Sequence, residues 1–474
     1  MIFRCRIIIL LKKKGVVKNM QSINTKDMTQ GSPMKLILGF AVPMLLGLLF
    51  QQFYSMVDTI IVGRWLGIDS LAAVGSTGSI NFMIIGFCMG ACSGFAIPVA
   101  QKFGAGDYKA LRKYFANSIW ISAIFSAVMT VAVCIFCMDI LKLMNTPENI
   151  IDEAYIYIFI IFAGIPTTYL YNLLSGVIRS LGDSKTPVYF LIFSALLNII
   201  LDIVSIKAFG MGVEGPALAT VISQLISGIL CIVFIIKKFD ILHIQKDELK
   251  FDLYYIWRLF AMGVPMGLQY SITAIGSVIL QTAVNGLGSG AVAAITAGTK
   301  VSTFFTCPYE ALGGTMATYA GQNVGAKKFD RISKGLNSAI IVGFIYSAAA
   351  AAVLILFGEK ISLLFMDSSE TQILSQAHYF LIVNSATYAL LTLVNTVRFC
   401  IQGMGFSVFA ILAGVFEMAA RTFVGFVLVP HFGYPAACFA NSLAWLMADI
   451  FLIPAFYICF KKLKSSSMAE KSEI

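Results

Sequence analysis

Charged residues are scarce in this chain. Asp, Glu, Lys and Arg make up 12% of its 474 residues and hydrophobic residues make up 58%, so the mean hydropathy is +0.85. Soluble domains carry about 25% charged residues, and this composition therefore excludes an ordinary soluble globular protein. The three histidines are far apart in the sequence and lie in or near expected loops. They indicate neither a zinc site nor a His-based catalytic centre.

A nucleotide-binding loop is also missing. No Gly-x4-Gly-Lys-Ser/Thr sequence occurs, and Gly104-Ala-Gly106 lacks both the spacing and the lysine of such a loop. The ten cysteines are scattered through apolar segments, without metal-ligand spacing or a paired loop pattern, so we interpret them as small core residues. These absences predict a protein that is not an enzyme, has no cofactor, and draws energy from a source other than ATP.

Long apolar runs dominate what is present. Twelve of them are long enough to cross a hydrocarbon core of about 30 Å. The spans are expected at Leu36–Gly63, Leu71–Ala100, Tyr114–Met138, Ile151–Ser175, Pro187–Ile206, Val213–Ile236, Ile256–Val284, Ala291–Tyr319, Gly335–Phe357, Ile373–Phe399, Phe406–Val429 and Tyr434–Phe460. The predicted fold class is an all-α polytopic membrane protein with twelve transmembrane helices.

Lys and Arg gather in alternate loops, which predicts the orientation because positive residues accumulate in short cytoplasmic loops. With the N-terminus inside, the basic loops are Lys102–Lys113, Arg179–Lys185, Lys237–Lys250 and Lys327–Lys334, whereas the opposite loops hold only Arg64, Lys142, Lys207 and Lys360. The chain is therefore expected to be a multi-pass protein of the plasma membrane with both termini in the cytoplasm. The net charge of +10 is then a topology signal, and nucleic-acid binding is not expected.

The second half of the chain repeats the first. Several motifs recur at offsets of 221 to 223 residues, which predicts an internal duplication. The paired motifs are Phe40-Ala-Val-Pro43 with Met262-Gly-Val-Pro265, Gln101…Gly104-Ala105 with Gln322…Gly325-Ala326, Arg179…Gly182 with Gln402…Gly405, and Phe209-Gly210 with Phe432-Gly433. Each half has an even number of spans, so two parallel six-helix lobes should enclose a central cleft.

This duplication predicts five regions. They are a disordered cytoplasmic tail (1–33), an N-lobe (34–236), a charged cytoplasmic linker (237–252), a C-lobe (253–460) and a cytoplasmic C-terminal tail (461–474). The predicted regions are compatible with a translation start at Met1, Met20 or Met28.

Asp58 lies inside the first span, where an ionisable group costs at least about 2.5–3.5 kcal/mol. It therefore needs a partner, a watery cavity or a proton. Asn198 and Asp202 share one face of the fifth span, and counting from the span ends places Asp58 and Asp202 at the same depth, about 8 Å below the outer boundary. Pro216 and Thr220 of the sixth span lie at a comparable depth. These oxygen-bearing groups form either an ion-coupling site or a hydrogen-bonded structural cluster.

Several motifs together are similar to those of one known family. They are Val57-Asp58 with Gly63-Arg64, the Gln101…Gly104-Ala105 and Gln322-Asn323…Gly325-Ala326 loops, Arg179…Gly182-Asp183-Ser-Lys-Thr-Pro187, and Asn198-Ile-Ile-Leu-Asp202. In order and spacing the chain resembles the multidrug and toxic compound extrusion (MATE) family from about Met34 to Lys462. The resemblance implies an N-lobe cation site at Asp58, Asn198, Asp202, the Pro216 carbonyl and the Thr220 hydroxyl. Such oxygen ligands suit a hard cation.

The C-lobe carries different charges. Thr273 stands where some sodium-coupled relatives carry an acidic residue, and Arg421 matches Asn198, which speaks against a second sodium site. This lobe is instead expected to bury Lys300, Glu310, Arg398, Glu417, Arg421 and Asp449. These residues form either a structural ion network or part of the substrate path.

The favoured hypothesis is a secondary antiporter that exports amphipathic, often cationic, organic compounds in exchange for H⁺ or Na⁺ by rocking two lobes. Its expected partners are small organic substrates and the lipid bilayer, and it is expected to function as a monomer. A flippase for a lipid-linked precursor is the alternative on the same fold, and would need a cleft rich in Arg or Lys. A membrane-embedded enzyme or receptor is the alternative of a different class.

Overall fold

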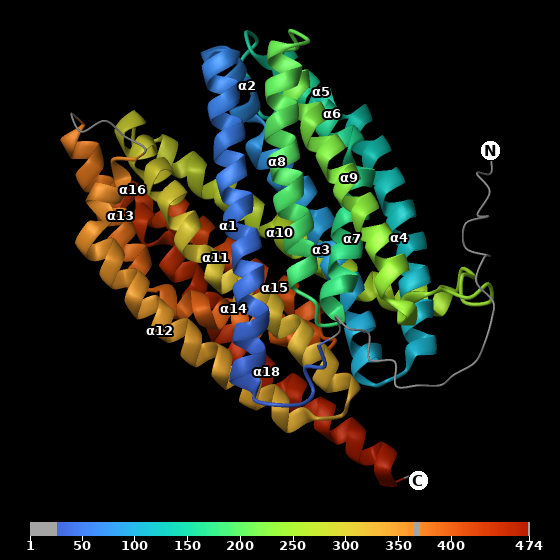
Figure 1. Ribbon diagram of the computed structural model, residues 1–474. Coiled ribbons are helices and arrows are strands. Elements are labelled where there is room, and N and C mark those ends of the chain that lie inside the picture. The colour runs from blue at the N-terminus through green and yellow to red at the C-terminus, as the bar shows by residue number, and fades with distance from the viewer. Residues whose placement is uncertain (1–25, 365–369, 473–474) are drawn as a thin grey trace.

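The computed structural model describes residues 26–364 and 370–472, which are helical almost throughout (Figure 1). The first half contains α1 (Pro33–Trp65), α2 (Ile68–Ser76), α3 (Gly78–Gly104), α4 (Tyr108–Ile135), α5 (Cys137–Leu143), α6 (Ile151–Ala163), α7 (Ile165–Ser180), α8 (Lys185–Lys207), α9 (Glu214–Lys238) and η1 (Asp240–Leu242). The second half contains α10 (Leu253–Asn285), α11 (Ser289–Gly325), α12 (Phe329–Ser362), α13 (Thr371–Ala386), α14 (Tyr388–Gly403), α15 (Val408–Phe423), η2 (Val424–Leu428), α16 (Val429–Phe432), α17 (Tyr434–Cys438) and α18 (Ala440–Ser472).

These helices make up the twelve expected spans. Within the described residues, nine helical stretches are individually long and apolar enough to cross a membrane, and the bent pairs α6–α7 and α13–α14 supply two more. The twelfth is α11, which is 37 residues long but not apolar enough to be counted among them. It packs against α1, α3, α12, α13 and α14. Because neighbouring helices cover it, α11 has less need of lipid-facing apolar residues.

Several of the expected spans are interrupted rather than continuous, and three of these breaks have a local cause in the sequence. α6 and α7 meet at 45° and α13 and α14 at 50°, while α2 and α3 are separated at Thr77. Pro166 explains the first bend, because its ring cannot follow on from an unbroken helix. At the other two breaks a threonine hydroxyl bonds a preceding carbonyl: Thr77 bonds Val74, and Thr387 bonds Asn384. These local bonds compete with the helical ladder.

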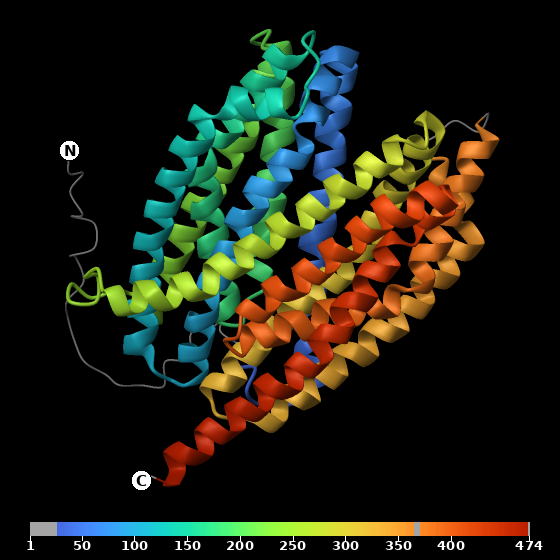
Figure 2. The same cartoon turned by 180° about the vertical axis from the view of Figure 1, so that it is seen from behind.

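The two halves form two lobes that stand side by side, α1–α9 in blue to green and α10–α18 in yellow-green to red (Figures 1 and 2). They approach each other at the end where α1 begins and α18 ends, which we call the terminal end, and they diverge toward the opposite, far end (Figure 2). The first helix of each half contacts both lobes: α1 packs on α8 and α11, and α10 packs on α15 and α3.

The backbone shows the duplication directly. Left-handed conformations, which only glycine adopts without strain, recur at the same places in both halves. The pairs are Gly67 and Gly288, Gly106 and Lys327, Gly182 and Gly405, and Gly210 and Gly433. Each pair is 221 or 223 residues apart, so the turns between spans repeat along with the spans.

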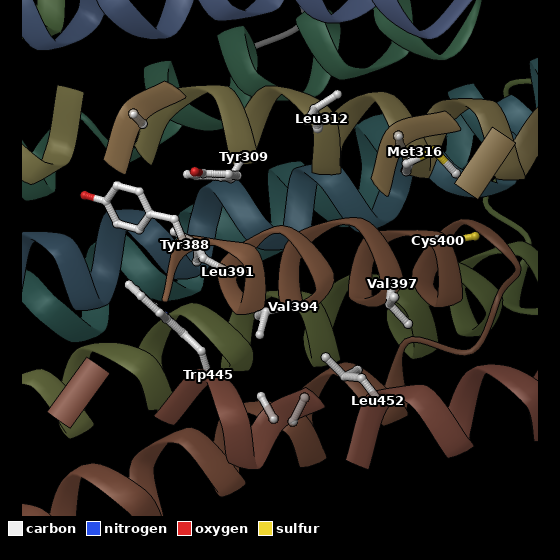
Figure 3. Close-up of a cluster of buried hydrophobic side chains, with 14 of the residues drawn as sticks. Tyr309, Leu312, Met316, Tyr388, Leu391, Val394, Val397, Cys400, Trp445 and Leu452 are labelled. Atoms are coloured by element: carbon white, nitrogen blue, oxygen red, sulfur yellow. The ribbon is translucent and has the colours of Figure 1, made fainter. Parts of the chain in front are cut away.

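The C-lobe core is built around α14, which lies between α11 and α18 (Figure 3). The ring of Tyr388 packs against Tyr309 of α11, with 5.6 Å between centroids, and against Trp445 of α18 at 6.1 Å. Buried hydroxyls find partners within the lobe, since Tyr388 bonds Ser302 and Tyr309 bonds Ser347. Lipid tails are as apolar as these side chains, so close packing and internal hydrogen bonds hold the lobe together.

At the terminal end the lobes meet through their backbones. A Cβ atom on Gly104 would overlap the backbone of Gln322, and a Cβ atom on Gly325 would overlap the backbone of Gln101. Glycine is therefore required at both positions for the ends of α3 and α11 to touch.

The same two glutamines also bond across this interface. Gln101 Nε2 donates to the Gly403 carbonyl at 3.0 Å, and Gln322 Nε2 donates to the Ser180 carbonyl at 2.9 Å. Gly403 and Ser180 occupy equivalent positions in the two repeats. The closure thus follows the symmetry of the duplication.

Residues 26–32, just before α1, cross from one lobe to the other at this end. The Lys26 N–H donates to the Leu181 carbonyl of the first lobe at 3.2 Å. The Met28 N–H donates to Gln322 Oε1 of the second lobe at 2.8 Å, and the Met28 side chain is fully buried. The segment therefore ties the lobes together on the side where they are closed.

The expectation of a disordered tail as far as residue 33 is wrong for residues 26–33, while residues 1–25 lie outside the described residues. Lys328 donates to the Thr29 carbonyl, and Arg331 donates to the carbonyls of Met28 and Gly31. The segment is thus held through its backbone carbonyls. Such contacts leave no periodic pattern of side chains in the sequence.

The linker between the lobes is anchored to α4. Arg112 forms two hydrogen bonds with the buried Glu248 carboxylate, at 2.6 and 2.7 Å, and this pairing lowers the pKa of Glu248. Asn117 also accepts from the Asp252 N–H at 2.9 Å.

Residues 461–472, expected to form a tail, continue α18.

Candidate functional site

A cavity of about 590 Å³ lies between the lobes. Its wall comes mainly from α1, α3, α6, α7, α8 and α9 of the first lobe, and α10, α11 and α14 of the second lobe complete it. A volume of this size accommodates a drug-sized molecule. Polar side chains such as Gln51, Asn81 and Asn172 alternate in the wall with apolar ones such as Met89 and Phe399.

Asp58 on α1 lines this cavity, and Asp202 on α8 lies fully buried behind it. The two carboxyl groups are electrostatic neighbours, and no hydrogen bond joins them in the described structure. Because two carboxylate anions offer only acceptors, such a bond forms only if one of them holds a proton. The agreement in depth expected from the sequence thus corresponds to direct proximity in the structure.

Asn198 and Thr220 join this pair. Asn198 Nδ2 lies 3.4 Å from Thr220 Oγ1, so α8 and α9 meet here. Within the described part of the chain, both carboxylate oxygens of Asp202, Oδ1 of Asp58 and Oδ1 of Asn198 are buried without a hydrogen-bond partner. Pro216 is buried one turn before Thr220 on the same face of α9, and the role of its carbonyl stays a prediction.

Two tyrosines complete the surroundings of the carboxyl pair, and sequence analysis missed both. Tyr54 of α1 and Tyr157 of α6 lie within electrostatic range of Asp58 and Asp202, and both line the cavity. Tyr54 precedes Asp58 by one helical turn, a spacing that could have revealed it. Tyr157 lies on α6, and only the packing of that helix brings it here.

This arrangement can bind a proton or a small hard cation. An unpartnered buried carboxylate is costly, and a proton or a cation ligated by its oxygens removes that cost. The neighbouring amide and hydroxyl oxygens are ligands of the type that Na⁺ accepts. The described residues contain no group of three or more His, Cys, Asp or Glu side chains that could hold a metal ion.

In the C-lobe, Glu417 of α15 is bound by two arginines. Arg398 of α14 donates to one of its carboxylate oxygens, and Arg421, one turn further along α15, lies 3.4 Å from the other. Asp449 of α18 is within electrostatic range of Arg398 and Glu417, yet neither of its oxygens has a hydrogen-bond partner among the described residues. All four side chains are buried.

The other two charges expected in this group lie elsewhere. Glu310 lines the central cavity and is exposed there, which contradicts its expected burial. It makes no ion pair or hydrogen bond with a described residue, so it does not belong to the network of Glu417. Lys300 is exposed, which contradicts its expected burial. Both residues lie on α11, and helix rotation, which the sequence does not reveal, decides which way each points.

Arg179 also differs from expectation. Its place after the fourth span suggested a cytoplasmic loop, but the structure places it in the last turn of α7, lining the cavity. Among the described residues of the cavity wall it is the one basic side chain.

Comparison with known proteins agrees with this architecture. The model of the MatE family matches residues 43–204 and 265–427, one match in each half. The chain is 31% identical to "Probable multidrug resistance protein YoeA" of Bacillus subtilis (strain 168), over 85% of this chain and 90% of that protein. It is 23% identical to a protein of Shewanella oneidensis named "FAD transporter", over 76% of this chain and 80% of the other.

Solved structures share the fold. A multidrug resistance MATE family transporter of the MOP superfamily, described as being in an outward-facing conformation, superposes with a TM-score of 0.87 at 21% identity and covers 93% of this chain and 99% of the other. A duplicated twelve-helix fold around a central cavity defines the class as a polytopic membrane transporter. The chain belongs to the MATE family of multidrug efflux transporters.

Proposed function

We propose that this chain is a secondary antiporter, which exports amphipathic and often cationic organic compounds in exchange for H⁺ or Na⁺. The two lobes alternate between facing outward and facing inward, and the ion binds at Asp58 and Asp202 with Asn198, Thr220 and the Pro216 carbonyl. The observation that carries this proposal is the pair of facing carboxyl groups, whose buried oxygens lack partners at the wall of the cavity. An ion bound there changes the stability of one lobe arrangement relative to the other.

The proposed topology, with both termini in the cytoplasm, decides which end of the molecule faces outward. In that orientation the lobes are closed on the cytoplasmic side, where Gly104 meets Gln322, and diverge on the outer side. Epitope tags after Lys109 and Asp247 should be cytoplasmic, and a tag near Glu148 should be external. The reverse labelling pattern would contradict the orientation.

The coupling ion is tested with purified protein in proteoliposomes loaded with ethidium. An H⁺ gradient and a Na⁺ gradient are imposed separately, each with the membrane potential clamped, and dye release is followed by fluorescence. One gradient should speed ethidium release above the leak, which is measured in vesicles without protein. No release above the leak under either gradient would overturn antiport.

The flippase alternative calls for several Arg or Lys side chains to hold phosphates. The described cavity wall offers one, Arg179. This favours an organic substrate over a lipid-linked diphosphate. The relative named "FAD transporter" leaves compounds with an anionic group within the range considered.

A further inference from the structure

Two basic side chains lie over neighbouring aromatic rings where α4 and α10 meet. The Lys113 Nζ lies 5.5 Å from the ring centroid of Tyr255, and the guanidinium carbon of Arg258 lies 5.6 Å from that of Tyr254. The two rings meet edge to face, with 5.4 Å between their centroids. Lys113 belongs to the first lobe and the other three residues to the second. We call this group of four residues the α4–α10 seam.

The positive charges of the seam are not neutralised. Lys113 and Arg258 form no ion pair with any residue that the structure describes. Two carboxylates, those of Asp107 and Asp252, act electrostatically on the ring under Lys113. Both are engaged: Asp107 pairs with Lys102 at 3.3 Å, and Asp252 accepts a backbone N–H in the first turn of α10 at 3.0 Å. The two cations are therefore free to bind an anion.

The surface beside the seam adds to this positive charge. Lys109 lies one turn before Lys113 on α4, and Asn117, one turn after it, donates to the Lys250 carbonyl of the linker at 3.4 Å. Lys109 and Lys250 are exposed and form no ion pair with a described residue. The linker carboxylate of Asp247 is exposed as well, so it offsets part of the charge and leaves a positive excess.

The seam lies at the membrane surface. The linker and the start of α10 pack beside α4 at the edge of the molecule (Figures 1 and 2). Trp257 and Leu253 at the start of α10 are 67% and 72% exposed, and Trp120 of α4 donates its indole N–H to the Leu249 carbonyl of the linker. Tryptophan and tyrosine gather where the hydrocarbon core meets the headgroups. The cations are thus at headgroup level, with exposed apolar side chains next to them.

We propose that the α4–α10 seam binds an anionic phospholipid. Its phosphate lies between Lys113 and Arg258, each of which is held in place by the ring beneath it, and its acyl chains lie over Trp257 and Trp120. Basic pockets between transmembrane helices recognise anionic headgroups in this way. A free phosphate ion would leave the apolar part of the surface uncovered, and a zwitterionic phospholipid brings a positive charge of its own to the two cations.

The test uses the quenching of tryptophan fluorescence by bromine atoms on lipid acyl chains. Trp65→Phe and Trp120→Phe together leave Trp257 as the exposed reporter, because Trp445 is buried. The full chain with these two changes is placed in vesicles of equal parts phosphatidylglycerol and phosphatidylcholine, with bromine on one lipid or on the other. Comparing the two quenching curves gives the relative association constant for phosphatidylglycerol near Trp257.

This measurement is repeated with Lys113→Gln and with Arg258→Gln. The matched control replaces Lys237 and Lys238 with glutamine, since both are exposed in the last turn of α9 and neither lies over an aromatic ring in the described part of the chain. Size-exclusion chromatography checks that each variant is folded. Either seam substitution by itself tests the proposal if the other does not fold.

The reporter protein should favour phosphatidylglycerol, and each seam substitution should lower the relative association constant about fivefold, the effect of one basic side chain close to an anionic surface. The control should keep the preference. An equal loss in the control, or no preference in the reporter protein, would mean a general attraction of anionic lipid to the basic end and would overturn the proposal. Exchanging sodium chloride for sodium phosphate at equal ionic strength should leave the preference unchanged. Its loss would assign the seam to a free anion instead of a lipid.

Discussion

The two lobes share one fold but carry different charges at equivalent positions. Asp58 and Asp202 of the first lobe correspond to Leu280 and Gly425 of the second, and Asn198 corresponds to Arg421. The duplicated backbone is therefore preserved while the proposed coupling residues are present in only one copy.

The converse holds for the C-lobe. Arg398, Glu417 and Asp449 correspond to Ser175, Ser194 and Ile226 of the first lobe. Glu417 is bonded to two arginines, whereas the carboxyl groups of the first lobe leave oxygens unbonded. A bonded charge resists change, and an unbonded one responds to an ion. If the proposed antiport holds, the first lobe is expected to respond to the ion and the bonded Glu417 to stabilise the second.

The largest effect is expected from neutralising the first lobe. Asp58→Asn should abolish gradient-driven efflux while leaving membrane insertion intact, because the isostere keeps the shape and removes the charge that couples ion to conformation. Asp202→Asn should do the same. The double variant should be little worse than either, since members of one site are not additive. Asp69→Asn, the same change at an exposed position on α2, is the matched control for dye efflux from proteoliposomes. Substantial efflux by Asp58→Asn would return this aspartate to a structural role.

Breaking the C-lobe network should act on stability. Glu417→Gln leaves Arg398 and Arg421 without their buried carboxylate, at a cost of about 3–5 kcal/mol, whereas Arg421→Ala leaves Glu417 paired with Arg398 and should cost less. In both variants the yield of folded protein should fall more than the activity per folded molecule. Thermal unfolding in detergent and transport normalised to folded protein measure the two quantities. Normal yield with selectively lost export would place the pair in the substrate path.

Asp449 offers a finer comparison inside the same network. Neither of its oxygens is bonded, so Asp449→Asn removes fewer contacts than Glu417→Gln and should lower stability by about 1 kcal/mol or less. Unfolding temperatures of the two variants, measured side by side, check the order. A loss of ion-driven efflux in well-folded Asp449→Asn would instead show that the second lobe also couples to the ion.

The symmetric closure offers a further comparison, between two equivalent glutamines. Gln322→Ala removes bonds to Ser180 and Met28 from a fully buried position, at about 1–3 kcal/mol, whereas Gln101→Ala removes one bond at about 1 kcal/mol. Hydrogen exchange of residues 26–32 should therefore rise more in Gln322→Ala. Equal exchange in the two variants would mean that the bond between Met28 and Gln322 does not hold residues 26–32 in place.

The sequence by itself determined the spans, the duplication and the depth of the ionisable groups. A bilayer imposes a one-dimensional pattern, so the distance of Asp58 and Asp202 from the ends of their spans predicted that they lie at one level. The repeated motifs predicted the two lobes for a similar reason, because each marks the same turn in both halves.

Only the tertiary structure decided which side of each helix faces which neighbour. Arg179 proved to line the cavity rather than a loop, Glu310 separated from the charges of its own lobe, and Tyr157 joined the carboxyl pair. Residues 26–32 bridge the lobes through backbone bonds that no side-chain pattern reports. Hydropathy encodes position along the membrane normal, but in an apolar solvent it says little about rotation around a helix axis, which close packing and internal hydrogen bonds select.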